Sequence, residues 1–170
     1  MKLLLFCVES NNKEQIDWIY IESIIRNMFA EDRNVTIRPL FMNGRSNYNS
    51  LKVRRCIERF QTMSYESVKV IYCVDTDRIE VNASQKKEFE GIVDYCNEKN
   101  YELIWFCHDI EEVFLGHSVS DSEKRACATK FIVNSGYRTL DIKKLMKTDY
   151  HAGWSNIITV IGNHLSLLSN

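Results

Sequence analysis

The sequence predicts an α/β fold: a parallel sheet of about four strands with helices packed against both of its faces. One observation is that short apolar runs of strand length alternate with longer stretches in which apolar residues recur at helical spacing. Another is that several of these runs are apolar throughout, as strands are when helices cover both faces of a sheet. A third is that no repeat or linker interrupts the alternation, so we expect a single domain over residues 1–170.

The first half of the chain is expected to supply three strands and the two helices that connect them. In order, these are a strand at 2–8, a helix at 13–30, a strand at 35–42, a helix at 49–63 and a strand at 68–74. Pro39, the only proline, lies inside the second strand and predicts an edge position, because proline cannot donate a hydrogen bond to a neighbouring strand. The turn residues Asn43 and Gly44 end that strand.

The second half is expected to add a helix, a fourth strand and a helical extension over about 108–170. Asn82 caps the helix, with Gln85 as its capping-box partner, and the fourth strand is 103–107. The extension includes a helix capped by Ser120 with Glu123 and ended by Gly136, a short basic helix opened by Asp141, and a last helix at 155–168. A strand order of 2-1-3-4 would place the first and third strands side by side.

The composition is that of an ordinary globular protein and bounds the function only loosely. The formal net charge is −1, so a nucleic-acid partner is permitted but is not indicated by the overall charge. The cysteines form no CxxC pair and have no metal-ligand spacing, which favours buried free thiols in a reducing compartment. Met1 and Lys2 lead directly into a strand, and no apolar segment approaches the ~20 residues of a membrane span. We therefore expect a cytoplasmic protein without a membrane partner.

Acidic residues at the ends of two predicted strands carry most of the functional information. Glu9 ends the first strand, and Asp75 and Asp77 follow the third. The carboxyl ends of parallel strands meet at one edge of a sheet, where open α/β sheets bind ligands. If the chain stays extended past Val74, Asp75 and Asp77 point the same way. Converging carboxylates repel one another unless cations lie between them, so we predict a Mg²⁺ or Mn²⁺ site, with one ion or two. The alternative is a turn in which these aspartates bond their own backbone.

This pattern of acidic residues resembles a known family. Val8-Glu9 after a leading strand and Asp75-x-Asp77 after a later one are similar to the TOPRIM domain of topoisomerases, primases and small nucleases. The turn at Asn43-Gly44 resembles the glycine-containing turn of that family. The resemblance covers about residues 2–107 and implies a Rossmann-like TOPRIM fold, acid–base or metal chemistry at Glu9, and Mg²⁺ held by the two aspartates. Ser10 departs from the family, which usually has glycine after the glutamate.

A second resemblance concerns the segment from Ile110 to His117. It is similar to a motif of the standalone RloB-like, OLD-like TOPRIM proteins, a group linked with prokaryotic defence loci. Glu111 and His117 keep the glutamate and the histidine of that motif, whereas Cys107-His108 replaces the usual asparagine-proline. The resemblance nominates Glu111 and His117 as catalytic residues beside Glu9. The alternatives are that Glu111 favours a helix N-terminus through the helix dipole and that His117 ends the helix.

Basic residues follow the acidic segment. Lys124, Arg125 and Lys130 are candidates to bind a phosphate backbone, with Lys124 as a catalytic residue that offsets charge in the transition state. The leading hypothesis is an enzyme, a Mg²⁺- or Mn²⁺-dependent nuclease of TOPRIM type that acts on DNA or RNA. Two alternatives stay open: a non-catalytic TOPRIM-like component that binds or senses a partner in a defence complex, and a receiver-like phosphoacceptor domain. The chain has no P-loop motif, so an ATPase partner would be a separate subunit.

Overall fold

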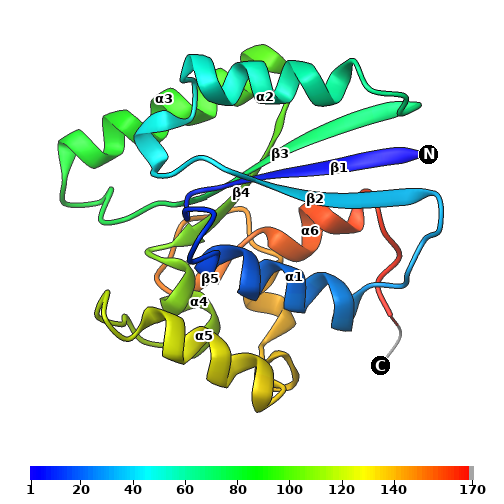
Figure 1. Ribbon diagram of the computed structural model, residues 1–170. Helices are drawn as coiled ribbons and strands as arrows, with labels where there is room; N and C mark the ends of the chain where they lie inside the picture. The colour runs from blue at the N-terminus through cyan, green and yellow to red at the C-terminus, as the bar shows by residue number, and fades with distance from the viewer. Residues whose placement is uncertain (169–170) are drawn as a thin grey trace.

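The computed structural model describes residues 1–168 and contains a five-stranded sheet with the order β2-β1-β3-β4-β5 (Figure 1). The strands are β1 (Lys2–Val8), β2 (Val35–Phe41), β3 (Ser67–Asp75), β4 (Glu102–Cys107) and β5 (Trp154–Ser155). The first four strands pair in parallel, which confirms the predicted α/β class and the order 2-1-3-4. β5 pairs antiparallel with β4 and is not predicted from the sequence. Residues 169–170 of the predicted domain lie outside the described residues.

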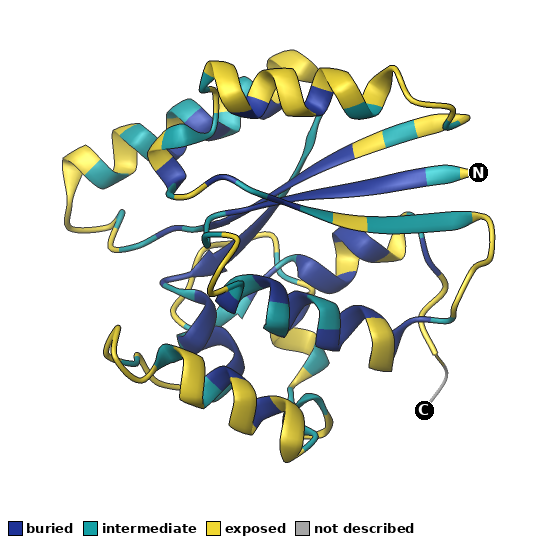
Figure 2. Cartoon of the chain, viewed as in Figure 1, coloured by how far each residue is buried: buried dark blue, intermediate teal, exposed yellow. Residues whose placement is uncertain are grey.

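Helices cover both faces of the sheet (Figure 1). One face carries α2 (Leu51–Gln61) and α3 (Ala83–Lys99); the other carries α1 (Ile16–Met28), α4 (Ile110–Leu115), α5 (Lys124–Val133) and α6 (Ile157–Gly162). From Leu3 to Val8, the side chains of β1 alternate between the two layers and are fully buried, with Phe6 on the side of α1 and Leu5 on the side of α2. In Figure 2, β1 is accordingly coloured as buried over most of its length. Within residues 1–168, no helix combines the length and the apolar character needed to cross a bilayer.

Two sequence signals act locally as predicted. Pro39 lies in β2, which is an edge strand, the position in a sheet where a proline without an N–H is tolerated. Asn82 caps α3 by accepting hydrogen bonds from the backbone N of Ser84 and of Gln85. The side chain of Gln85 does not return the bond to Asn82; its Oε1 accepts from the backbone N of Arg78 at 3.2 Å and secures the loop that follows β3.

The helical extension differs from the prediction at Ser120, at Gly136 and after Asp141. Glu123, and not Ser120, is the N-cap of α5. α5 ends at Val133, and Gly136 begins a 3-10 helix, η2 (Gly136–Thr139), instead of ending α5. A Cβ on Gly136 would lie 2.3 Å from the ring of Phe131, so close packing, and not a left-handed cap, requires glycine here. Asp141 does open a basic turn, but η3 (Ile142–Leu145) is a 3-10 helix.

The predicted helix at 155–168 is wrong at both ends. Ser155 belongs to β5, and its Oγ donates to the backbone O of Trp105 at 2.6 Å. After α6 ends at Gly162, Nζ of Lys2 donates to Nδ1 of His164 at 2.7 Å, and Nε2 of His164 contacts Oε2 of Glu102 at 2.6 Å. These contacts with the first residues of β1 and β4 draw the chain away from a helical path. Helical periodicity carries no information about them.

Candidate functional site

The carboxyl ends of β1 and β3 place Glu9 beside Asp75. Val8 pairs with Cys73 at the end of β1, so the two strands leave the sheet close together. Oε1 of Glu9 accepts a hydrogen bond from the backbone N of Asp75 at 2.8 Å. The turn after β2 closes on the same point, because the backbone N of Gly44 donates to the backbone O of Glu9 at 2.8 Å. Three strand ends therefore converge at Glu9, as the strand order requires.

Two further carboxylates come from helices that begin at this edge of the sheet. Asp17 lies in the first turn of α1, and its Oδ2 accepts from the backbone N of Ser10 at 2.7 Å. Glu111 lies in the first turn of α4 and is 1 % exposed, and within residues 1–168 neither of its carboxylate oxygens has a hydrogen-bond partner. We call Glu9, Asp17, Asp75 and Glu111 the acidic cluster. Asp17 is not predicted from the sequence; the available signal was an acidic residue in the first turn of the helix that follows the first strand.

The pKa values show how unfavourable it is to ionise this cluster. Burial raises the pKa of Glu9 to about 8, with repulsion by Asp17 as a further cause. Burial also raises the pKa of Asp75 well above its ordinary value, and the charges of Glu9 and Asp17 add to the effect. Burial raises the pKa of Asp17 and of Glu111 as well. Carboxyls in this state favour either protons or a cation that replaces them.

Lys124, at the start of α5, brings a positive charge to the cluster. Its Nζ lies 3.6 Å from Oε2 of Glu111 and 3.5 Å from Oδ1 of Asp121. Burial lowers the pKa of Lys124, but the surrounding carboxylates, Glu111 and Asp75 foremost, outweigh this and raise the pKa above its usual value. The ammonium is therefore charged at neutral pH. It balances only part of the charge that the four carboxylates would carry.

A groove of about 420 Å³ gives access to the cluster. Its lining consists of Glu9, Ser10, Asn11, Glu14, Ile16, Asp17, Asn43, Gly44, Asp75, Asp121 and Lys124. Three of the four cluster residues and the ammonium of Lys124 thus face a common space that solvent or a ligand can enter. Polar donors and acceptors dominate this lining, which suits a charged ligand better than an apolar one.

Asp77 is turned toward a different partner from Asp75. Its backbone φ is 53°, so the chain leaves the extended conformation directly after β3, and its backbone N donates to the backbone O of His108 at 2.8 Å. Oδ2 of Asp77 lies 2.7 Å from Nη2 of Arg45. The expectation that Asp75 and Asp77 share one direction on an extended chain is therefore wrong. A left-handed turn and an ion pair separate them.

The structure also separates the two residues nominated in the segment after β4. Glu111 is buried at the cluster, whereas His117 follows the C-cap Gly116, whose φ is 80°, and is exposed. The only hydrogen bond of the His117 ring in the described structure joins its Nδ1 to the backbone O of Ser118 at 3.1 Å. The structure does not bring His117 to the acidic cluster, and its place matches the alternative of a residue at a helix end.

Other polar candidates hold the framework of the site. The ring nitrogens of His108 lie 2.9 Å from Oε1 of Glu80 and 3.1 Å from Oε2 of Glu112, so the ring joins α4 to the loop after β3. Nη1 of Arg125 donates to the backbone O of Lys13 at 3.3 Å, and Lys130 is exposed further along α5. Of the three basic candidates Lys124, Arg125 and Lys130, Lys124 lines the groove and the other two do not.

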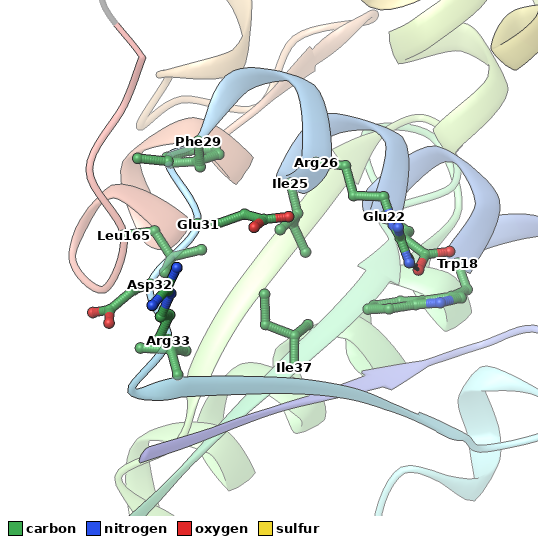
Figure 3. A pocket seen from close by; sticks show the side chains of 12 residues that line it. Trp18, Glu22, Ile25, Arg26, Phe29, Glu31, Asp32, Arg33, Ile37 and Leu165 are labelled. Atoms are coloured by element: carbon green, nitrogen blue, oxygen red, sulfur yellow. Dashed lines mark hydrogen bonds and ion pairs between the residues drawn. The ribbon is translucent and has the colours of Figure 1, made fainter. Parts of the chain in front are cut away.

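A second pocket, of about 350 Å³, lies between α1 and the edge strand β2 (Figure 3). Trp18, Ile25 and Ile37 form part of its apolar wall, and Glu22 and Arg26 pair at 2.7 Å on its rim. No residue of the acidic cluster lines it. The groove at the strand ends, and not this pocket, is therefore the one lined by residues of the acidic cluster.

Comparisons with known proteins identify no relative of this chain, so the description of the site rests on its own geometry. No protein-family model, curated protein or solved structure matches the chain. Among residues 1–168, no group of three or more His, Cys, Asp or Glu side chains already has the arrangement of a metal site. The acidic cluster is thus a set of neighbouring carboxyls that a cation would have to draw together.

Proposed function

We propose that the protein is a Mg²⁺- or Mn²⁺-dependent phosphodiesterase of TOPRIM type that cleaves DNA or RNA. The observation that carries the proposal is the carboxyl of Glu111, which is 1 % exposed and has no hydrogen-bond partner in the described part of the chain, next to three more carboxyls of raised pKa. Leaving a buried polar group unsatisfied costs ~1–3 kcal/mol, and more when it is charged. A cation among these groups would remove that cost.

The donor set fits a hard divalent ion. Glu9 and Asp75 are adjacent, and Asp17 and Glu111 approach from two helix ends, so carboxylate oxygens would supply the protein ligands. Side-chain rotations would have to bring these oxygens into one shell. A bound ion would supply charge neutralisation at a phosphate and activation of a water molecule.

The residues of the chain itself would bind and orient the substrate. Lys124 faces the groove with a charged ammonium, and an ammonium there can bind a phosphate oxygen and offset charge in the transition state. Without the ion, Glu9 has a pKa of about 8, so near neutral pH its carboxyl can exchange its proton for the cation. The strand order and the contact of Glu9 with Asp75 agree with what the TOPRIM resemblance implies and support the family assignment.

The test is calorimetric titration with Mn²⁺, combined with cleavage assays on single- and double-stranded DNA and RNA. We expect binding and divalent-dependent cleavage by the wild type, and loss of both in Asp75→Asn. Asp94→Asn, on the exposed side of α3, is the matched control and should change neither. Mn²⁺ binding without cleavage of any nucleic acid would favour the non-catalytic, partner-binding alternative. Absence of both Mn²⁺ binding and cleavage in the wild type would refute the proposal.

A further inference from the structure

The turn after β2 places a buried arginine beside the acidic cluster. Arg45 follows Asn43 and Gly44, whose φ values of 63° and 111° reverse the chain, and the backbone N of Gly44 is bonded to Glu9. The side chain of Arg45 is 9 % exposed. A guanidinium remains charged in proteins, so a buried one must be paired on most of its N–H groups.

The guanidinium of Arg45 has three different partners. Nη1 donates to the backbone O of Asp75 at 2.7 Å, and Nη2 lies 2.7 Å from Oδ2 of Asp77. Nη2 and Nε also donate to Oε2 of Glu88, at 2.7 and 3.3 Å. Only the planar fork of arginine can serve a carbonyl and two carboxylates in this way, because lysine presents a single ammonium on a flexible stem. Arg45 thus holds both ends of the turn from Asp75 to Asp77.

We infer that Arg45 is a positioning residue that holds Asp77 out of the cation site. The site then uses Asp75, and Asp77 can join it only when the ion pair between Arg45 and Asp77 breaks. This inference rests on the proposed function. The turn is firmly held, since Thr76 is fully buried and the backbone N of Asp77 is bonded to His108. Glu88 makes release of Asp77 feasible, because it remains bonded to Arg45 and the guanidinium is not left without a carboxylate. An ion that recruits Asp77 must therefore compete with Arg45.

A double-mutant cycle on Mn²⁺ affinity tests the competition. Asp77→Asn alone should change the affinity less than twofold. Arg45→Gln should raise the Mn²⁺ affinity roughly tenfold, because the substitution frees the carboxylate of Asp77 and removes a positive charge. Substitutions next to metal ligands typically change metal affinity by ~10–100-fold, so this is the smaller end of that range. Most of that gain should disappear in the Arg45→Gln, Asp77→Asn double variant. Arg26→Gln, which removes an exposed arginine paired with Glu22 on α1, is the control and should have no effect.

Two results of the cycle would overturn the inference. One is that Asp77→Asn alone weakens Mn²⁺ binding as much as Asp75→Asn does, which would make Asp77 a ligand from the start. The other is that the gain of Arg45→Gln persists in full in the double variant, which would leave only a charge effect.

Hydrogen–deuterium exchange without metal separates this inference from the proposed function. Arg45→Lys keeps the charge but loses the fork, so the amide of Asp77 should exchange at least tenfold faster than in the wild type. Glu88→Gln leaves Asp77 as the remaining carboxylate on Arg45 and should slow that exchange. Unchanged exchange in both variants would overturn the positioning role whether or not Mn²⁺ binds. Faster exchange in Arg45→Lys, in a protein that binds no Mn²⁺, would uphold the positioning of Asp77 and refute the metal site.

Discussion

The pH dependence of stability without divalent ions tests the acidic cluster directly. A carboxyl whose pKa is higher in the folded than in the unfolded protein holds its proton more tightly when folded. Its contribution is therefore complete at low pH and is lost as the pH rises through the folded-state pKa. For Glu9 the ordinary value is 4.5 and the folded value is about 8, so the loss falls between these two pH values. The raised pKa values of Asp75, Asp17 and Glu111 act with the same sign.

The size of the effect follows from the pKa of Glu9. At ~1.4 kcal/mol per pH unit, the interval between 4.5 and about 8 gives an upper bound of about 5 kcal/mol at high pH. Glu9 lines a groove that is open to solvent, which screens its charge, so we expect about 2 kcal/mol between pH 5.5 and pH 8. For a chain of this length that corresponds to a Tm lower by ~4–8 °C at pH 8.

Glu9→Gln isolates the charge from the hydrogen bond. The Oε1 of glutamine can still accept from the backbone N of Asp75, but the side chain can no longer ionise. In EDTA, the variant should match the wild type at pH 5.5 and melt at a higher temperature at pH 8. Glu90→Gln, which removes an exposed carboxylate 3.9 Å from Lys86, is the control and should follow the wild type at both pH values.

Scanning calorimetry in EDTA decides the matter. If the Tm of the metal-free wild type rises from pH 5.5 to pH 8, the cluster does not carry the repulsion described above. If Glu9→Gln melts well below Glu90→Gln at pH 8, Glu9 stabilises the fold through its charge, and its place in a cation site loses its physical basis.

Three further substitutions give separate tests. Glu111→Gln removes a buried carboxylate that the ammonium of Lys124, 3.6 Å away, compensates only in part, so the metal-free Tm at pH 8 should rise while Mn²⁺ affinity falls roughly tenfold or more in calorimetric titration. His117→Ala should leave Tm, Mn²⁺ affinity and cleavage unchanged, because the ring is exposed and bonded only to Ser118 in the described structure; a large loss of cleavage would place His117 in the site. Gly136→Ala puts a Cβ 2.3 Å from the ring of Phe131 and should cost ~1–3 kcal/mol in urea unfolding, whereas Gly162→Ala, with open space around it, should cost less than half as much.

The sheet could be predicted because its signals are local to each strand. β1 and β3 are apolar on both faces, and Pro39 identifies β2 as an edge strand without knowledge of any other element. The end of the chain could not be predicted in this way. The contacts of His164 with Lys2 and Glu102 join residues far apart in sequence, and β5 forms only because β4 already offers an edge.

The candidate site shows the same division between local and distant causes. A carboxylate at the end of a buried parallel strand must reach the ligand-binding edge of the sheet, so Glu9 and Asp75 could be located from the sequence. The direction of Asp77 could not. Alternating acids share a face only while the chain stays extended, and here Arg45, from the turn after another strand, binds the carbonyl of Asp75 and the carboxylate of Asp77 together. That fork is satisfied only when the chain turns between the two aspartates. An acidic pair after a strand therefore specifies the edge at which the site lies, while a cation on a neighbouring loop decides which of the two carboxylates faces it.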